Sequence, residues 1–237
     1  MTLAGEPKGV AEVVSRETSS VGPAPDAARA LFGDRLPLIQ TYVDLLATAG
    51  VERGLIGPRE VPRLWERHVL NCAVIAELIQ PGAAVDDVGS GAGLPGIVLA
   101  IQRPDLRVAL VEPLLRRTTF LDEAVELLRL RNVVVVRARA EDRGRSGPTA
   151  DVVTARAVAP LPKLAGWCLP LLRPGGALLA LKGEAAADEI AAYLASSPAG
   201  VAGVDLVTMG EGTVDPPTMV VRIRRSTERI PKRKGRR

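Results

Sequence analysis

Histidine and cysteine are scarce in this chain, which has one histidine, His68, and two cysteines, Cys72 and Cys168, among 237 residues. A tetrahedral zinc site needs four ligands, so these three residues are too few for a site built from Cys and His alone. A disulfide between the two cysteines is one option, but two buried, reduced thiols agree better with an intracellular protein. We therefore expect a protein without a metal centre.

Long apolar runs are also missing. No stretch is long and apolar enough to cross a bilayer, which takes about 20 consecutive apolar residues. The first 20 residues carry charges throughout and lack the apolar core of a secretory signal. These absences predict a soluble, cytoplasmic protein that does not act in a membrane.

Aromatic residues make up only 3% of the chain, which argues against nucleic-acid recognition on a broad stacking platform. Charge is unevenly distributed. Residues 222–237 contain nine Lys or Arg and one Glu, a local charge of +8, so the remainder of this chain of net charge +4 carries −4. A mildly acidic body with a basic end indicates a polyanionic partner, although a solvated tail that aids solubility explains the run equally well.

The pattern of apolar residues along the sequence changes near residue 80. The N-terminal stretch is rich in Gly, Pro, Ser and charge without periodicity, and apolar residues then recur at helical spacing with an interruption at Pro37. We expect two helices or one kinked helix over 26–49 and a further helix over 61–79. The predicted organisation is a disordered tail (1–25), one folded domain (26–226) made of a helical cap (26–80) and an α/β core (83–226), and a basic tail (227–237).

Strands alternate with helices after residue 83, which predicts an α/β sheet covered by helices on both faces. Two closing strands separated by a short loop predict an antiparallel hairpin at one end of a mostly parallel sheet. The expected strands are 83–88, 106–111, 132–136, 151–155, 176–181, 204–209 and 219–223, and the expected helices between them are 96–102, 114–130, 160–172 and 184–194.

The glycine-rich stretch VDDVGSGAGLPG (85–96) follows the first of these strands, at the sheet edge where open α/β sheets bind ligands. Its second half, Gly91–Gly96, matches the G-x-G-x-x-G of dinucleotide-binding proteins. Its first half, in which Asp87 precedes Gly89, Ser90 and Gly91, instead has the acidic-then-glycine pattern of an S-adenosylmethionine (AdoMet) site. The two patterns imply different chemistry.

Acidic residues distinguish the two ligands. Asp87 would stand close to the pyrophosphate of NAD, where two like charges about 4–6 Å apart cost on the order of 1 kcal/mol or more. AdoMet has no phosphate, and its sulfonium and ammonium groups attract a carboxylate. Glu112, at the end of the second strand, suits the ribose hydroxyls of either ligand. Because no Tyr-x-x-x-Lys of a dehydrogenase is present either, we favour AdoMet over NAD.

Several short segments occur in a distinctive order: WERHVLN (65–71), DDVGSGAGLPGIVLAI (86–101), RRTTFLDE (116–123), RARAED (137–142), TARAVAPL (154–161), ALKGE (180–184) and the final PKRKGRR. Together they resemble the ribosomal RNA small subunit methyltransferase G family (also called glucose-inhibited division protein B) and cover most of residues 60–237. The resemblance implies a Rossmann-like AdoMet-dependent methyltransferase sheet. It also implies methylation of a guanine N7 in 16S ribosomal RNA, presented as naked RNA, the small ribosomal subunit or an assembly intermediate.

The resemblance also implies roles for individual residues. Gly89 and Leu94 would contact the cofactor through the loop, Ala140 and Glu141 would hold the adenine ring, and Arg156 would lie beside the cofactor at the catalytic edge. The full set of expected cofactor contacts is Asp87, Gly89, Ser90, Gly91, Leu94, Glu112, Ala140, Glu141 and Arg156. The expected RNA contacts are Arg116, Arg117, Arg139, Lys182, Lys232, Arg233 and Lys234, with Arg137 as a further candidate.

No catalytic acid or base is expected, because the lone pair of guanine N7 attacks a methyl group without losing a proton, and positioning then suffices. The segment after the fourth strand, ARAVAP, also lacks the Asn/Asp-Pro-Pro-aromatic motif of enzymes that methylate exocyclic amines. We read His68 as a structural histidine with satisfied partners.

Two departures from the family lie in the cap: Gly54-Leu55-Ile56 replaces a usual Asn-Leu-Thr, and Asn71-Cys72 replaces a frequent Asp-Ser. Because of these departures, the resemblance assigns no substrate contacts in the cap, whereas the glycine loop matches the family pattern. Two other functions stay open, an AdoMet-dependent methyltransferase of a small molecule or protein, and a nucleic-acid-binding protein without activity.

Overall fold

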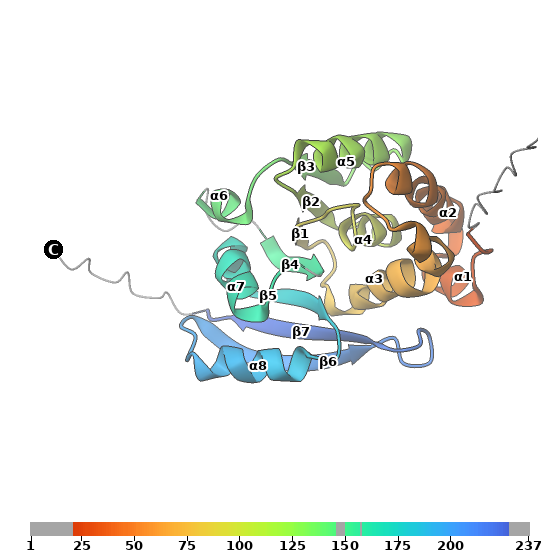
Figure 1. Cartoon of the computed structure of the whole chain (residues 1–237). Coiled ribbons are helices and arrows are strands. Elements are labelled where there is room, and N and C mark those ends of the chain that lie inside the picture. The colour runs from red at the N-terminus through yellow and green to blue at the C-terminus, as the bar shows by residue number, and fades with distance from the viewer. Residues whose placement is uncertain (1–20, 146–149, 157, 228–237) are drawn as a thin grey trace, which may run out of the picture.

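The computed structural model describes residues 21–145, 150–156 and 158–227, which fold around one seven-stranded sheet (Figure 1). The strands lie side by side in the order β3-β2-β1-β4-β5-β7-β6. Their bounds are β1 (Ala84–Val88), β2 (Arg107–Val111), β3 (Val133–Val136), β4 (Ala150–Arg156), β5 (Leu172–Lys182), β6 (Val201–Met209) and β7 (Thr218–Arg225).

Five strands run parallel and the last two form a hairpin. β1 pairs in parallel with β2 and β4, β2 with β3, and β4 with β5. β7 lies antiparallel between β5 and β6. The predicted mostly parallel sheet with an antiparallel C-terminal hairpin is therefore confirmed, and so is the α/β class.

Successive side chains of the strands enter two different cores, as expected for a sheet buried on both faces. Val152 and Leu179 pack under the cap and helices α4 and α5, whereas their neighbours Val153 and Leu178 pack under α6, α7 and α8. Each large apolar side chain buried in this way stabilises the fold by about 1.5–3 kcal/mol. These helices are α4 (Gly96–Gln102), α5 (Leu115–Leu127), α6 (Ala140–Arg145), α7 (Leu161–Cys168), which continues into η6 (Leu169–Leu171), and α8 (Ala186–Ala195).

The N-terminal helices form a cap that packs on α4 at one side of the sheet (Figure 1). Its aliphatic and aromatic residues share one core with α4. The cap elements are α1 (Asp26–Phe32), η1 (Gly33–Arg35), α2 (Leu36–Leu45), η2 (Leu46–Gly50), η3 (Pro58–Arg63), η4 (Leu64–Leu70), α3 (Asn71–Ala73) and η5 (Val74–Leu78).

The cap helices begin and end at other residues than the sequence predicts. The first helical run bends at Gly33, whose φ of +47° suits glycine, and Pro37 lies in the first turn of α2, where its missing N–H does no harm. The predicted helix over 61–79 is instead a continuous helical path of mixed hydrogen-bond spacing from Pro58 to Leu78. Residues 21–25, which we assigned to the disordered tail, lie against the cap, where Trp65 Nε1 donates to Gly22 O (3.2 Å).

Two further differences lie in the α/β core. Helix α6 was not predicted, because its six residues are too short and too charged for an apolar periodicity. Strand β5 begins at Leu172, four residues earlier than expected, and takes in the Pro-Gly-Gly turn through an irregularity in its pairing with β4. Cys72 and Cys168 are free and buried, as expected. Within the described ranges, no helix is long and apolar enough to span a membrane.

Candidate functional site: the carboxyl edge of the sheet

The carboxyl ends of β1, β2, β4 and β5 meet along one edge of the sheet, because these strands are parallel and adjacent. Arg156 ends β4 and is paired in register with Leu181 of β5. The glycine loop follows β1 at the same edge, and Glu112 follows β2. The topology therefore brings the acidic residues, the glycine loop and the strand-end arginine of the sequence prediction to one place.

Asp87 lies beneath the glycine loop and is completely buried (0% exposed). Its Oδ2 accepts a hydrogen bond from the backbone N–H of Gly96 (3.1 Å), and its Oδ1 accepts one from Thr154 Oγ1 (2.9 Å). Burial raises the pKa of the carboxyl to about 6, against the opposing effect of these hydrogen bonds. The side chain thus joins β1, β4 and α4, and it faces the underside of the loop rather than an open ligand surface.

The glycine loop is held from below and from the cap. Ser90 is buried and its Oγ donates to Asp87 O (2.7 Å), while the hydroxyl of Tyr42, from α2, donates to Ala92 O (2.7 Å). Leu94 is half-buried and packs on the core. Gly89 has a φ of +71°, and a Cβ there would meet a methyl carbon of Val158 at 2.9 Å. A side chain at Gly89 would therefore fill the space between the loop and the segment after β4.

Glu112 opens onto a cavity of about 290 Å³, the glutamate cavity. Only 1% of Glu112 is exposed, and its carboxylate accepts hydrogen bonds from the backbone N–H groups of Gly91 (3.2 Å) and Leu114 (3.1 Å). The cavity has a largely apolar lining. Its walls are Val88, Gly89, Val111, Glu112, Pro113, Leu114, Arg117, Ala138, Arg139, Ala140, Glu141, Val158 and Trp167.

A second cavity of about 310 Å³, the loop cavity, lies between the glycine loop and the cap. It shares Gly89, Arg117 and Val158 with the glutamate cavity, so the two adjoin. Its other lining residues are Gly54, Leu55, Gly91, Ala92 and Arg156. The two cavities form one cleft that runs from Glu112 past the glycine loop to Arg156.

Arg156 is fixed by the cap. It donates to His68 O (3.4 Å), to Cys72 Sγ (3.4 Å) and to His68 Nδ1. Because Nδ1 accepts from Arg156, the proton of a neutral His68 sits on Nε2, which faces Glu60 Oε2 at 2.8 Å. Burial and the nearby Arg156 charge lower the pKa of His68, in agreement with a neutral ring. The prediction that His68 has satisfied structural partners is confirmed.

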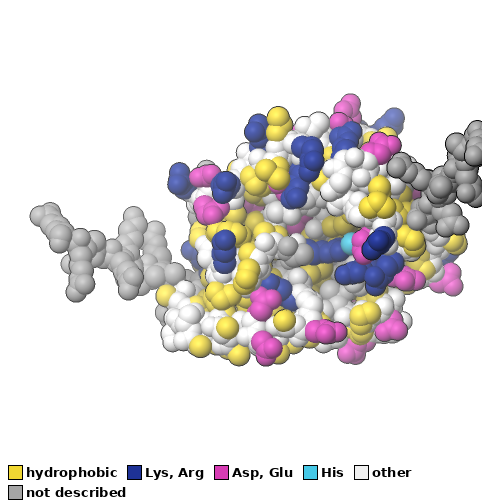
Figure 2. Space-filling view, viewed as in Figure 1, with side chains coloured by type: hydrophobic (Ala, Val, Ile, Leu, Met, Phe, Trp, Pro, Cys, Tyr) yellow, Lys and Arg dark blue, Asp and Glu magenta, His cyan; other side chains and the backbone are white. Residues whose placement is uncertain are grey.

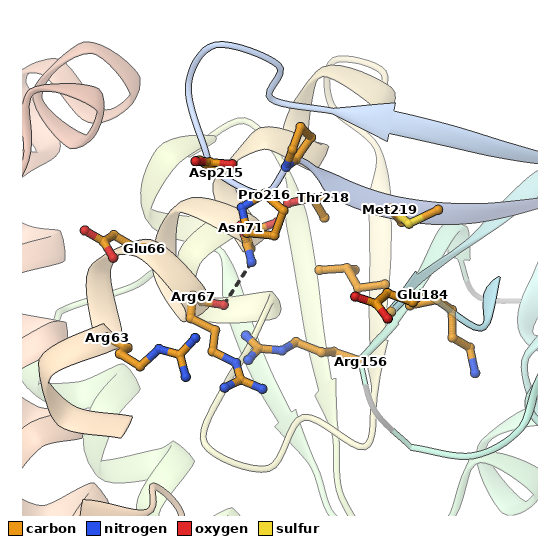
Figure 3. Close-up of a pocket in the computed structure, with 14 residues that line it drawn as sticks. Arg63, Glu66, Arg67, Asn71, Arg156, Glu184, Asp215, Pro216, Thr218 and Met219 are labelled. Carbon is orange, nitrogen blue, oxygen red and sulfur yellow. Dashed lines mark hydrogen bonds between the residues drawn. The ribbon is translucent and has the colours of Figure 1, made fainter. Parts of the chain in front are cut away.

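A third and larger cavity of about 590 Å³, the arginine cavity, lies on the far side of Arg156. Figure 2 shows Lys and Arg side chains around the hollow in this face, beside the single histidine. Close up, the guanidinium groups of Arg63, Arg67 and Arg156 gather at one side (Figure 3). The remaining lining residues are Glu66, Asn71, Leu181, Lys182, Gly183, Glu184, Asp215, Pro216, Pro217, Thr218 and Met219.

The expected RNA contacts fall into different places. Arg116 is exposed on α5 and Arg139 is exposed beside the glutamate cavity, so both are open to a polyanion. Arg117 instead turns into the cleft, where its Nη1 lies 3.4 Å from Glu112 Oε2. Lys232, Arg233 and Lys234, together with most of the predicted basic tail, lie outside the described residues.

Lys182 is largely engaged inside the protein. Its Nζ donates to Ala159 O (2.8 Å) and to Glu189 Oε2 (2.8 Å), and 9% of its side chain is exposed. The same Glu189 oxygen accepts from the backbone N–H of Leu161 (2.6 Å). The pair therefore fastens the segment between β4 and α7 to α8, which gives Lys182 a structural function beside the RNA contact that we predicted.

The sequence reasoning missed several residues of the site. Tyr42 and Trp167 carry no local signal, because each comes from an element far from the glycine loop in sequence. Arg63 and Arg67 did have one, since residues four apart lie on the same face of a helix. Their position beside Arg156 follows only from the packing of the cap.

Sequence comparison with known proteins gives one consistent family. A model of the rRNA small subunit methyltransferase G family matches residues 35–202. The ribosomal RNA small subunit methyltransferase G of Thermobifida fusca is 64% identical over 201 residues, 84% of each chain, and that of Streptomyces avermitilis is 57% identical over 208 residues, 87% of each chain.

Solved structures show the same fold at much lower identity. A SAM-dependent O-methyltransferase from Thermotoga maritima matches with a TM-score of 0.55 and 14% identity, over 80% of this chain and 73% of the other. The family match spans the glycine loop, Glu112 and Arg156, and it confirms the resemblance found in the sequence. The chain belongs to the rRNA small subunit methyltransferase G family.

Proposed function

We propose that this protein transfers a methyl group from AdoMet to N7 of a guanine in 16S ribosomal RNA. The observation that carries the proposal is the cleft formed by the glutamate and loop cavities, which leads from a buried carboxylate along the glycine loop to Arg156. Membership in the rRNA small subunit methyltransferase G family supports the same reaction.

The residues of the cleft fit AdoMet. Glu112 has a carboxylate that suits two ribose hydroxyls, and Ala140 and Glu141 stand at the same cavity, where an adenine ring would lie. Gly89 leaves the space in which a side chain would meet Val158. The buried Nε of Arg117 has no hydrogen-bond partner among the described residues, and the Arg117 side chain lines both cavities. An unpaired buried donor is costly, so a polar ligand group beside it would be favourable.

Charge also favours this cofactor. In our proposal Asp87 acts from beneath the loop through its negative charge, which a low-dielectric surrounding screens weakly. Ser90, Gly91 and Leu94 shape the loop above it. A pyrophosphate in the same cleft would be repelled by Glu112 at the cavity wall and by Asp87 from beneath the loop, which disfavours NAD.

Beyond binding the cofactor, the protein has to position the guanine N7 in line with the methyl group. When bound, AdoMet supplies a methyl group on a sulfonium centre, and the electron pair of the sulfur–carbon bond stays on sulfur as N7 takes the methyl, so the positive charge ends on the guanine ring. No proton leaves N7, and the protein needs no general base. Arg156 lines both the loop cavity and the arginine cavity, where it can help hold the acceptor at the cofactor. Well-oriented reactants alone contribute about 7–11 kcal/mol to lowering a barrier.

RNA affinity would come mainly from Lys and Arg contacts to phosphate, and it should fall with salt. Arg116, Arg139 and the basic tail are the candidates that we retain from the sequence. Removing residues 227–237 should weaken RNA binding and leave AdoMet affinity intact, which filter binding and calorimetry on the same preparation would measure. Equal loss of both would contradict this division. With the ribosome as its substrate source, we expect the protein to act in the cytoplasm.

Mass spectrometry of digested 16S ribosomal RNA from cells with and without the gene tests the proposal. We expect one 7-methylguanosine to disappear on deletion, to return fully with the wild-type gene and to return in lower yield with a Glu112→Gln gene. Unchanged ribosomal RNA methylation would instead favour a methyltransferase of a small molecule or protein. Failure to bind AdoMet in calorimetry would favour a nucleic-acid-binding protein without activity.

A further inference from the structure

The arginine cavity has the size and position of a site for the acceptor nucleotide. Its volume of about 590 Å³ lies within the range of about 300–1,000 Å³ typical of small-molecule pockets. Arg156 lines both this cavity and the loop cavity, so the two sites meet at one side chain. A base in the arginine cavity would therefore lie next to the cofactor end of the cleft.

Three guanidinium groups and one carboxylate reach this cavity from opposite sides. Arg63 and Arg67, one turn apart on the cap, present guanidinium groups together with Arg156, while Glu184 stands opposite and points into the cavity (Figure 3). Within the described residues, the Glu184 carboxylate has no hydrogen-bond or ion-pair partner. Met219 and Leu181 add an apolar surface on the Glu184 side. Such a cavity offers a phosphate site on one wall and a base site on the other.

We propose that the Glu184 carboxylate recognises the acceptor guanine by accepting hydrogen bonds from N1–H and the 2-amino group, while Arg63 and Arg67 hold an adjacent phosphate. This inference rests on the proposed function. A carboxylate is the natural partner of that edge of guanine, because guanine is the common base with two neighbouring donors there. N7 lies on the other side of the ring, so a base gripped in this way turns N7 away from Glu184 and toward the Arg156 wall.

The same contact strengthens during the reaction. Guanine gains a positive charge when N7 is methylated, which makes N1–H and the 2-amino group better donors. The arginines around the cavity repel that charge, whereas the Glu184 carboxylate attracts it. An interaction that is stronger in the transition state than in the ground state raises kcat, so Glu184 should contribute to rate as well as to recognition.

The other two carboxylates of the cavity are placed less well. Glu66 points away from the three guanidinium groups, and Asp215 lies at the rim on the loop between β6 and β7 (Figure 3). Glu184 follows β5 by two residues, and β5 pairs with the strand that ends in Arg156. It therefore stands at the carboxyl edge itself, beside the reacting groups.

Inosine, which lacks only the 2-amino group of guanosine, provides a direct test. We would ligate a 16S ribosomal RNA that carries either guanosine or inosine at the methylated position and measure kcat/KM for each. The wild-type protein should prefer guanosine by about tenfold or more, as expected for one hydrogen bond to a charged group. Glu184→Gln and Glu184→Ala should lower kcat on guanosine by about tenfold or more and reduce the preference to within about twofold. Glu66→Gln is the matched control and should keep the wild-type preference.

The outcomes separate this inference from the proposed function. If the wild-type protein does not methylate the guanosine RNA, the proposed function fails. If the wild-type protein methylates the guanosine RNA, the function stands. The assignment of Glu184 is then overturned if the wild-type protein shows no preference for guanosine over inosine, or if both Glu184 variants keep the full wild-type preference. Cofactor affinity, measured by calorimetry, should be the same in all variants, which excludes a general loss of folding.

Arg63 tests the phosphate wall independently. Arg63→Gln should weaken binding of the guanosine and inosine RNAs by the same factor and reduce the slope of log Kd against log salt by about 0.7–0.9, the value for one lost phosphate contact. A variant that instead changes the guanosine preference would place the base, rather than the phosphate, at the arginines.

Discussion

Replacing Asp87 with asparagine should remove most of the pH dependence of cofactor binding between pH 7 and pH 5. The carboxyl is completely buried, and burial raises its pKa to about 6, although hydrogen bonds from Thr154 and Gly96 favour the charged form. Asparagine has nearly the same shape, keeps one acceptor oxygen and carries no charge. The substitution therefore isolates the charge beneath the loop.

The expected magnitude follows from the raised pKa. With a pKa of about 6, Asp87 is about 90% ionised at pH 7 and about 90% protonated at pH 5, whereas an ordinary Asp is ionised at both. If the cationic cofactor binds the ionised form, its Kd should rise about tenfold from pH 7 to pH 5, or about 1.4 kcal/mol.

The same shift predicts how folding depends on pH. A raised pKa means that the folded protein binds more protons than the unfolded chain between pH 4 and pH 6. Stability should therefore fall as pH rises through this window, by about 3 kcal/mol for a shift from 3.8 to about 6, and Asp87→Asn should lack this contribution.

Isothermal titration calorimetry at pH 7, 6 and 5 would measure the effect with AdoMet and with S-adenosylhomocysteine, whose sulfur is neutral. His68 also gains charge as pH falls, but it is present in both proteins, so the difference between them reports Asp87. The reasoning is refuted if wild type and Asp87→Asn show the same change of Kd with pH. A change shared equally by both ligands would assign the attraction to the ammonium group instead of the sulfonium.

Three other substitutions test the site. Gly89→Ala should cost about 1–2 kcal/mol of stability because of its positive φ, and should weaken AdoMet binding at least tenfold through the contact with Val158; thermal unfolding and calorimetry would separate the two. Glu112→Gln should lower AdoMet affinity about 10- to 100-fold, as expected when hydrogen bonds to a charged group are lost, and an unchanged Kd would remove Glu112 from the ribose site. Tyr42→Phe leaves the buried carbonyl of Ala92 without its donor and should cost about 1–3 kcal/mol in urea unfolding, whereas a loss below 0.5 kcal/mol would show that water replaces the hydroxyl.

Much of the α/β core was readable from the sequence, because each of its signals is local. The short strand before the glycine loop, the glycines themselves and Glu112 at the next strand end are each defined within a few residues. Parallel pairing then forces them to one edge of the sheet. The hairpin of β6 and β7 was predictable for the same reason, since its strands are joined by a short loop.

The charged side chains were harder to place. Arg117 and Lys182 both follow apolar segments and both are basic, so the sequence offered RNA phosphate as a partner for each. In the structure Arg117 reaches Glu112, and Lys182 binds Glu189 and a backbone carbonyl. A long flexible side chain pairs with the nearest opposite charge in space. Which charge is nearest depends on how the helices pack against one another, and the sequence does not reveal that packing.

The sequence alone was enough to identify the family, the succession along the chain of the strands and of the core helices other than α6, and the residues of the glycine loop, since these depend on periodicity and on short contiguous motifs. Only the folded chain shows that Asp87 lies under the loop, that His68 and Cys72 hold Arg156, and that Glu184 faces Arg63 and Arg67 across a cavity. These contacts join residues from the cap and from different strands, many positions apart along the chain. Such contacts arise when the cap and the sheet bury their apolar faces against each other, and no local pattern specifies which polar groups that burial brings together.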